Sequence, residues 1–322
     1  MTPTDPSSIE TMAPGDWPAA PERRFAERQA DLARECGLEV ASRVVETDAA
    51  GRVHFLEAGD PDGDPVLLLH GITEPAATWL PMAPALAGDY RLVAPDMPGE
   101  GLSAKPTDRG RDLRAAATAY LADLLDALGL DRVDVVGHSL GGWQAFLCAL
   151  DRDRAARLCL VGAPIGVSRD FPLLPRLMTV RGLNRLLFGL MRAGDPVAVA
   201  EDWVARVGVV DDSAVPESYY ELYASRFGLP GLSTSLRSLM TGASSFGRMR
   251  PLVDLRDEIA TIDRPTSFVW GTEDYYWPPA VGRVVAERMP DAAFHELAGH
   301  GHAPWLEPGD AAETRVRAFL DG

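Results

Sequence analysis

The chain has a single lysine, Lys105, only three cysteines and no long hydrophobic run. Its 31 basic residues are outnumbered by 47 acidic ones, which gives a formal charge of −16. Such a charge repels phosphates, so it argues against nucleic acid, anionic membrane surfaces and polyanionic substrates. No apolar stretch approaches the roughly 20 residues that span a bilayer. We therefore expect neither a nucleic-acid partner nor a membrane span. The acidic bias itself fits a GC-rich genome or adaptation to high salt equally well.

Signals for secretion and for disulfide bonds are also missing. Residues 1–20 contain several prolines and acids but neither a basic start nor an apolar core, which predicts a flexible N-terminal segment instead of a leader. The three cysteines, Cys36, Cys148 and Cys159, are odd in number, stand mostly in apolar surroundings and lack zinc-ligand spacing. We expect reduced thiols, a cytoplasmic location and no bound metal.

Short apolar runs alternate with helix-like stretches along most of the chain. The 322 residues, 46% of them hydrophobic, suffice for one large core with an inserted lobe. Turn chemistry joins the first two strands as a hairpin, whereas the later strands alternate with helices and so predict a mostly parallel sheet with helices on both faces. The eight strands are expected near residues 39–46, 52–58, 66–70, 90–94, 132–136, 157–161, 266–270 and 292–297, and helices near 22–34, 112–128, 140–150 and 281–289.

The strand pattern stops between residues 166 and 263. Apolar, helix-like segments separated by prolines replace it, near residues 173–178, 183–191, 197–207 and 218–227. We interpret residues 166–263 as a helical cap inserted into a core that is formed by residues 21–165 and 264–322.

A Gly-x-Ser-x-Gly motif follows one of the apolar strands. Gly137, Ser139 and Gly141 stand between the run that ends at Val136 and a helix-forming stretch. A sharp strand-to-helix turn would hold Ser139 in a strained conformation, and the flanking positions would have no room for side chains. The helix would direct its free N–H groups and positive dipole end toward the serine. The motif alone also fits an ordinary turn.

The order of the neighbouring motifs favours a nucleophile. One apolar strand ends in His70-Gly71, another in a carboxylate at Asp274, and a third in the histidines His300 and His302. Serine, aspartate and histidine thus follow one another just beyond strand ends, where open α/β sheets place reacting groups. This chain order belongs to one of the three unrelated triad arrangements.

These motifs resemble the α/β-hydrolase fold family with a helical cap, in particular the serine esterase and lyase type that carries Gly-His-Ser-Leu-Gly-Gly, here residues 137–142. The resemblance covers roughly residues 38–322. It implies an α/β fold with a mostly parallel eight-stranded sheet and a catalytic triad.

Within this resemblance, Ser139 is the nucleophile and His302 the base, because family members place the histidine in a Gly-x-Gly-His frame with a glutamate five residues later, here Glu307. The family frame Gly-x-x-Asp makes Asp274 the orienting acid, with Glu273 as its competitor. His300 is expected as a neighbour with a structural or entrance role, since a metal site at His300 and His302 lacks further ligands.

The oxyanion donors are expected to be the backbone N–H groups of Ile72 and Leu140. His70 and Asp96 are interpreted as scaffold, and His54 as a surface or satisfied core residue. The residues expected to line the pocket are Trp79, His138, Phe171, Trp203, Tyr219, Tyr275 and His300.

A serine nucleophile argues against dehalogenase and epoxide hydrolase chemistry. Carbon–carbon bond hydrolases of this fold usually carry Asn before the serine and an aromatic residue after the histidine, where this chain has His138 and Ala303. We therefore expect a carboxylic-ester, thioester or lactone hydrolase that acts on a small, hydrophobic molecule without a cofactor, as a monomer or homodimer. A carbon–carbon hydrolase, an acyltransferase and a non-catalytic binding protein remain alternatives.

Overall fold

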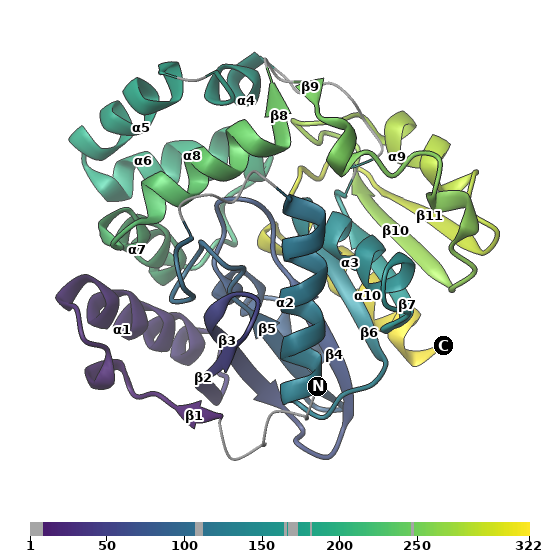
Figure 1. Ribbon diagram of the computed structural model, residues 1–322, viewed down its shortest axis with the longest axis horizontal. Coiled ribbons are helices and arrows are strands. Elements are labelled where there is room, and N and C mark those ends of the chain that lie inside the picture. Colours follow the sequence, from purple (N-terminus) through teal and green to yellow (C-terminus); the bar gives the residue numbers. More distant parts are fainter. Residues whose placement is uncertain (1–8, 107–111, 164–165, 167–172, 181, 246–247) are drawn as a thin grey trace.

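The computed structural model describes residues 9–106, 112–163, 166, 173–180, 182–245 and 248–322. A nine-stranded sheet forms its middle, in the spatial order β1-β2-β3-β5-β4-β6-β7-β10-β11 (Figure 1). Strands β1, β2, β3 and β5 pair antiparallel, and the pairs from β5 through β11 are parallel. The bounds are β1 Glu10–Thr11, β2 Val40–Thr47, β3 Gly51–Gly59, β4 Asp64–Leu69, β5 Tyr90–Pro95, β6 Val133–His138, β7 Ala155–Val161, β10 Thr266–Gly271 and β11 Ala292–Leu297. The α/β class and all eight expected strands are confirmed, and the short β1 adds a ninth strand that the sequence pattern did not predict.

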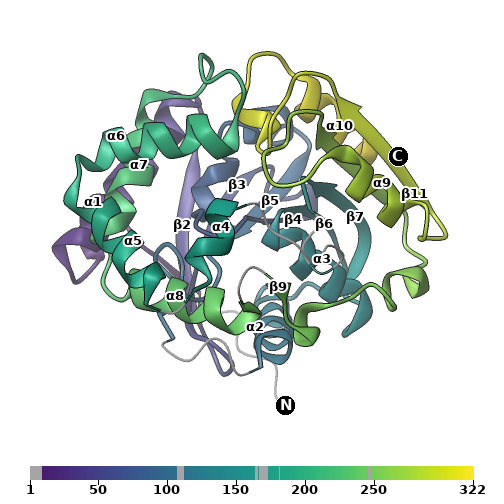
Figure 2. The ribbon, with the colours of Figure 1, turned by 90° about the horizontal axis from the view of Figure 1, so that it is seen from above.

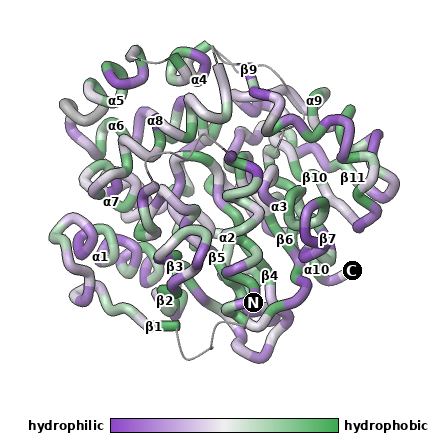
Figure 3. Tube along the Cα trace, in the orientation of Figure 1, coloured by the Kyte–Doolittle hydropathy of each residue, from purple (hydrophilic) through white to green (hydrophobic). Residues whose placement is uncertain are grey.

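Both faces of the sheet are buried, which explains why apolar residues stand on both faces of the central strands. In β4, Val66 and Leu68 enter one hydrophobic cluster, and Leu67 and Leu69 enter the other. Helices α1 (Ala20–Glu35) and α10 (Ala311–Asp321) contribute to the first cluster, whereas α2 (Leu113–Ala127), α3 (Leu140–Leu150) and α9 (Pro279–Ala286) contribute to the second. Peripheral helices such as α1 and α9 carry both hydrophilic and hydrophobic residues along their length (Figure 3).

The N-terminal region differs from the expected flexible segment from residue 9 onward. Strand β1 pairs with β2, and Trp17 is 1% exposed. The Trp17 ring lies 5.6 Å from the His54 ring, and the Arg52 guanidinium lies 5.0 Å above it. The abundance of proline predicted a loose chain, but burial of one large aromatic side chain and pairing at an open sheet edge outweigh that tendency.

Five helices follow β7 and lie over the carboxyl ends of the parallel strands (Figures 1 and 2). We call them the cap: α4 Leu173–Met178, α5 Leu183–Ala193, α6 Pro196–Trp203, α7 Glu217–Ser225 and α8 Leu232–Ala243. A π-helical turn, Val204–Gly208, extends α6, and two short strands, β8 Ser244–Ser245 and β9 Arg248–Met249, follow α8. The sequence pattern did not predict α8, because its Leu-Ser-Thr-Ser start is poor in strong helix formers.

All three cysteines are unpaired, and burial raises the pKa of Cys148 and Cys159 to about 12. These two thiols therefore stay protonated and unreactive near neutral pH. Among the described helices, none combines the length and the apolar character needed to cross a bilayer.

Candidate active site

Ser139 occupies the tight turn between β6 and α3. Its backbone has φ 51° and ψ −112°, a conformation that L-residues rarely adopt and that costs on the order of 1–3 kcal/mol. Glycine is required beside it: a Cβ atom at Gly141 would lie 2.0 Å from the Leu69 carbonyl oxygen, and one at Gly137 would lie 2.7 Å from the Gly141 oxygen. The turn is therefore built around Ser139, as the motif predicts.

His302 and Asp274 meet beyond the ends of β11 and β10. The His302 Nδ1 atom lies 2.7 Å from the Asp274 Oδ2 atom. The other carboxylate oxygen accepts hydrogen bonds from the N–H groups of Tyr276 and Trp277, at 2.8 and 3.1 Å. Both oxygens of Asp274 are thus held, so the carboxylate is fixed against the imidazole ring. Glu273, the competing acid, is exposed.

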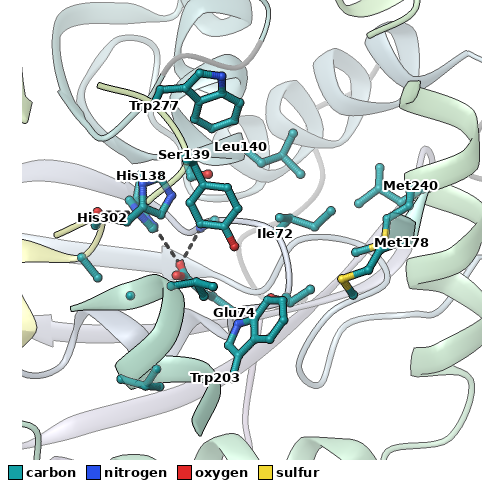
Figure 4. Close-up of a pocket in the computed structure, with 18 of the residues that line it drawn as sticks. Ile72, Glu74, His138, Ser139, Leu140, Met178, Trp203, Met240, Trp277 and His302 are labelled. Atoms are coloured by element: carbon teal, nitrogen blue, oxygen red, sulfur yellow. Dashed lines mark hydrogen bonds and ion pairs between the residues drawn. The ribbon is translucent and has the colours of Figure 1, made fainter. Parts of the chain in front are cut away.

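Ser139 and His302 line the same cavity, which lies between the sheet and the cap and has a volume of about 110 Å³. Figure 4 shows Ser139, His138 and His302 gathered on one side of it. Asp274 does not line the cavity but is bonded to the His302 ring. The structure therefore brings together the three residues that the sequence proposes as a triad.

The wall opposite these residues is largely apolar. Met178 of α4 and Met240 of α8 lie on one side, and Trp203 of α6 lies near Glu74 on another (Figure 4). No arginine or lysine is among the described residues that line this cavity. The cavity is therefore suited to an uncharged, hydrophobic group.

The expected lining residues divide into three groups. His138, Trp203 and Tyr219 line the cavity. Trp79, Tyr275 and His300 do not: Trp79 stacks on Trp305 at 4.8 Å, Tyr275 is 38% exposed, and the His300 ring bonds to the Ala298 carbonyl oxygen at 3.0 Å. Phe171 lies outside the described residues.

Tyr276 takes the place that the sequence assigned to Tyr275. Its ring lies 4.5 Å from the His302 ring and lines the cavity. Adjacent tyrosines after Asp274 signalled an aromatic wall, but which of them turns inward depends on the turn that the carboxylate caps.

The N–H groups of Ile72 and Leu140 are available as donors. Both residues line the cavity, and in the described part of the chain neither N–H has a hydrogen-bond partner. Leu140 is the first residue of α3, so its N–H is one of those that a helix start leaves free. Both N–H groups can therefore bond to a group bound in the cavity, and Ile72 and Leu140 stay the predicted oxyanion donors.

Glu74 is a site residue that sequence reasoning missed. Its Oε2 atom accepts hydrogen bonds from the Gly71 N–H at 2.8 Å and from the His138 Nδ1 atom at 3.0 Å. The other nitrogen of His138 lies 3.1 Å from the His302 carbonyl oxygen. Both partners of the His138 ring are acceptors, which suits a ring that donates from both nitrogens. One bonded chain thus links the turn after β4, the serine turn and the histidine loop.

The electrostatics of Glu74 follow from this bonding. Burial by itself would raise its pKa, but the charge of His138 and hydrogen bonds from His138 and Gly71 lower the pKa from 4.5 to about 2. Glu74 is therefore ionised at neutral pH. The only sequence signal for it was an acid within an otherwise uncharged segment after His70-Gly71.

His70, Asp96 and His54 form the scaffold beneath the site. The His70 Nδ1 atom donates to the Gly71 oxygen, at 2.7 Å, and its Nε2 atom accepts from the Met97 N–H at 2.9 Å. Asp96 accepts from the N–H groups of Ala76 and Leu102 and contacts His54 Nδ1, each at 2.7 Å. His54 is fully buried, so it is a satisfied core residue.

Comparison with known proteins places this geometry in a family. Residues 66–314 match the Alpha/beta hydrolase family. The chain is 30% identical over 280 residues to 2-hydroxymuconate semialdehyde hydrolase of Pseudomonas putida, covering 84% of this chain and 92% of that protein. It superposes on the carboxylesterase CesB (YbfK) from Bacillus subtilis with a TM-score of 0.74 and 20% identity, over 94% of this chain and 99% of the other. A meta-cleavage product hydrolase from Pseudomonas fluorescens IP01 superposes with a TM-score of 0.69 and 24% identity, over 86% of this chain and 97% of the other. The structures share the fold, and the extended sequence match assigns the chain: it is a hydrolase of the Alpha/beta hydrolase family.

Proposed function

We propose that this protein is a serine hydrolase that cleaves a carboxylic ester, thioester or lactone of a small, uncharged and largely hydrophobic molecule. The observation that carries the proposal is that Ser139 and His302 lie on the same side of one apolar cavity (Figure 4), with Asp274 bonded to Nδ1 of the imidazole ring. The strained backbone of Ser139 supports it, because such strain persists where the surrounding structure holds a reactive group in place.

In the proposed reaction, Ser139 Oγ attacks the carbonyl carbon while His302 Nε2 accepts the hydroxyl proton. The N–H groups of Ile72 and Leu140 stabilise the oxygen anion of the tetrahedral intermediate. His302 then gives its proton to the leaving alcohol, and an acyl group remains on Ser139. A water molecule, deprotonated by His302, releases the acid by the same steps. Asp274 keeps the Nδ1 proton in place and stabilises the imidazolium form.

The cavity favours an ester over the carbon–carbon substrates of some relatives. The names of those relatives specify dioate or muconate acids, which carry carboxylates. In this chain the described lining has no arginine or lysine to pair with a carboxylate, and it includes the ionised Glu74. A carboxylate buried there would have no arginine or lysine to pair with, and the charge of His138 is already taken up by Glu74, so its burial is unfavourable. Ala303, which follows His302, also lines the cavity, whereas carbon–carbon bond hydrolases of this fold usually have an aromatic residue at that position.

Turnover of chromogenic esters tests the proposal. We expect p-nitrophenyl acetate and butyrate to be hydrolysed through many cycles by the wild type, and Ser139→Ala to abolish the reaction. Ser267→Ala is the matched control, because Ser267 is also buried but lies in β10, and its hydroxyl has no hydrogen-bond partner among the described residues.

The alternatives predict other products. A carbon–carbon hydrolase would cleave a 2-hydroxy-6-oxodienoate faster than any ester. An acyltransferase would pass the acyl group to an added alcohol or thiol in preference to water. One acyl release per molecule without turnover would indicate a binding protein, and each of these results would overturn the ester assignment.

A further inference from the structure

The cap contacts the turn that carries Ile72. The Tyr223 hydroxyl, from α7, lies 3.2 Å from the Thr73 Oγ1 atom. Arg226, in the short 3-10 helix Arg226–Gly228 that follows α7, donates from Nη1 to the Thr73 carbonyl oxygen. Tyr223 and Arg226 are 3% and 4% exposed, so these bonds are shielded from water. The cap is thus bonded directly to the residue next to the proposed oxyanion donor.

Thr73 has a backbone conformation that is unfavourable for a β-branched side chain. Residues Gly71 to Glu74 form a turn closed by a hydrogen bond from the Glu74 N–H to the Gly71 oxygen, at 3.3 Å. Thr73 is its third residue and has φ 67°. A positive φ at that position marks a type II turn and normally requires glycine, and it is unfavourable for a β-branched residue. Contacts outside the turn must therefore maintain it.

Arg226 and Tyr223 act as one unit. The guanidinium lies 3.7 Å from the centre of the Tyr223 ring, and its Nε atom donates to the Tyr223 carbonyl oxygen at 3.2 Å. A buried cation stacked on an aromatic ring is strongly oriented. Arg226 can therefore hold the Thr73 oxygen at a defined position.

Helix α7 is itself fixed from the other side by α1. The Ser218 N–H and hydroxyl both bond to Glu35, the last residue of α1, and Arg28 pairs with Glu221 at 2.7 Å. Helix α1 precedes the region that matches the family. Helix α7, which carries Tyr223, is therefore bonded to α1 as well as to Thr73.

We propose that Arg226 and Tyr223 are positioning residues, which hold the Gly71–Glu74 turn in its type II form and so aim the Ile72 N–H at the developing oxyanion. This inference rests on the proposed function. Without these contacts the turn relaxes toward a negative φ at Thr73, and the donor moves away from the reacting carbonyl.

The test separates transition-state binding from substrate binding. For wild type, Tyr223→Phe, Arg226→Met and Arg226→Lys we would measure kcat and KM with a p-nitrophenyl ester. We would also measure inhibition by a trifluoromethyl ketone, which forms a tetrahedral adduct with an activated serine, and by the matching methyl ketone. We expect Arg226→Met to lower kcat about 100-fold and to raise the inhibition constant of the trifluoromethyl ketone by a similar factor. KM and the inhibition constant of the methyl ketone should stay within about threefold of the wild-type values. Tyr223→Phe has a smaller effect of the same kind, and Arg226→Lys retains part of the activity.

A rescue variant makes the test specific. Glycine adopts a positive φ without strain, so Thr73→Gly in the Arg226→Met background should restore part of the lost kcat. Tyr220→Phe is the control, because Tyr220 lies on the same helix but its hydroxyl faces Asp212, at 3.5 Å. It should behave as wild type.

The outcomes are distinct. If Arg226→Met and Tyr223→Phe lower only the unfolding temperature and leave kcat and trifluoromethyl ketone inhibition unchanged, or if Thr73→Gly rescues nothing, the positioning role is wrong while the proposed function stands. If the wild type neither hydrolyses an ester nor binds the trifluoromethyl ketone, the proposed function fails and this inference fails with it.

Discussion

Replacement of Glu74 by glutamine tests the bonded chain that joins the three parts of the site. The change keeps the size of the side chain and an oxygen that can accept from Gly71, but it removes the charge that faces His138. In the folded protein the pKa of Glu74 is about 2, against 4.5 for an unperturbed glutamate. At 1.36 kcal/mol per unit, this difference corresponds to about 3 kcal/mol of stability near pH 7. The side chain is 15% exposed, so solvent screening reduces this value little.

The pH dependence gives the sign of the effect. Because the pKa is lower in the folded protein than in the unfolded chain, the contribution of Glu74 is complete above about pH 4.5 and is lost as the pH falls toward 2. We expect the unfolding free energy of Glu74→Gln to lie about 2–3 kcal/mol below that of wild type from pH 6 to 8. The difference should narrow below pH 4.5.

Urea unfolding at several pH values measures this difference. Glu221→Gln is the control, because Glu221 also forms an ion pair, with Arg28, but is 39% exposed, and such surface pairs contribute about 0–1 kcal/mol. Equal losses for the two variants, or a loss for Glu74→Gln that is the same at pH 7 and at pH 3, would show that the Glu74 charge does not stabilise the fold in this way.

Three further substitutions test separate parts of the site. Asp274→Asn should leave the circular dichroism spectrum unchanged and lower kcat by roughly 10⁴, because the amide favours the wrong imidazole tautomer; a near-normal rate would remove Asp274 from the mechanism. Ile72→Pro should cost about 3 kcal/mol of transition-state stabilisation in kcat/KM, whereas Ile72→Ala keeps the N–H and should cost far less. Asp96→Asn should lower the unfolding free energy by about 2 kcal/mol at pH 7. Burial would raise the pKa of Asp96, yet the charge and hydrogen bond of His54 lower it to about 2, so the loss should shrink as the pH falls below 4.

The sequence predicts most of the fold because its hydrophobic pattern is unambiguous in the core. Runs such as that of β4 are buried on both faces, and glycines at 137 and 141 mark a turn that admits no side chain. The proposed catalytic residues follow strand ends, so the sheet alone brings Ser139, Asp274 and His302 to one edge.

The lining of the cavity is harder to predict because it depends on the cap and on turn conformations. Tyr275 and Tyr276 are identical as residues, and the hydrogen bond from the Tyr276 N–H to Asp274 decides which ring faces His302. Glu74 and Arg226 had no motif to mark them, since their roles arise from contacts with residues 64 and 153 positions away. Trp79 is an aromatic residue near the site, but stacking on Trp305 turns it into the core.

Labelling with a fluorophosphonate tests the central claim most directly, because the reagent reacts with an activated serine and requires no knowledge of the substrate. We expect one phosphonyl group per chain, mapped to the peptide that contains Ser139, and none on Ser139→Ala. Absence of labelling on the folded wild type, or a label on another residue, would show that Ser139 is not an activated nucleophile.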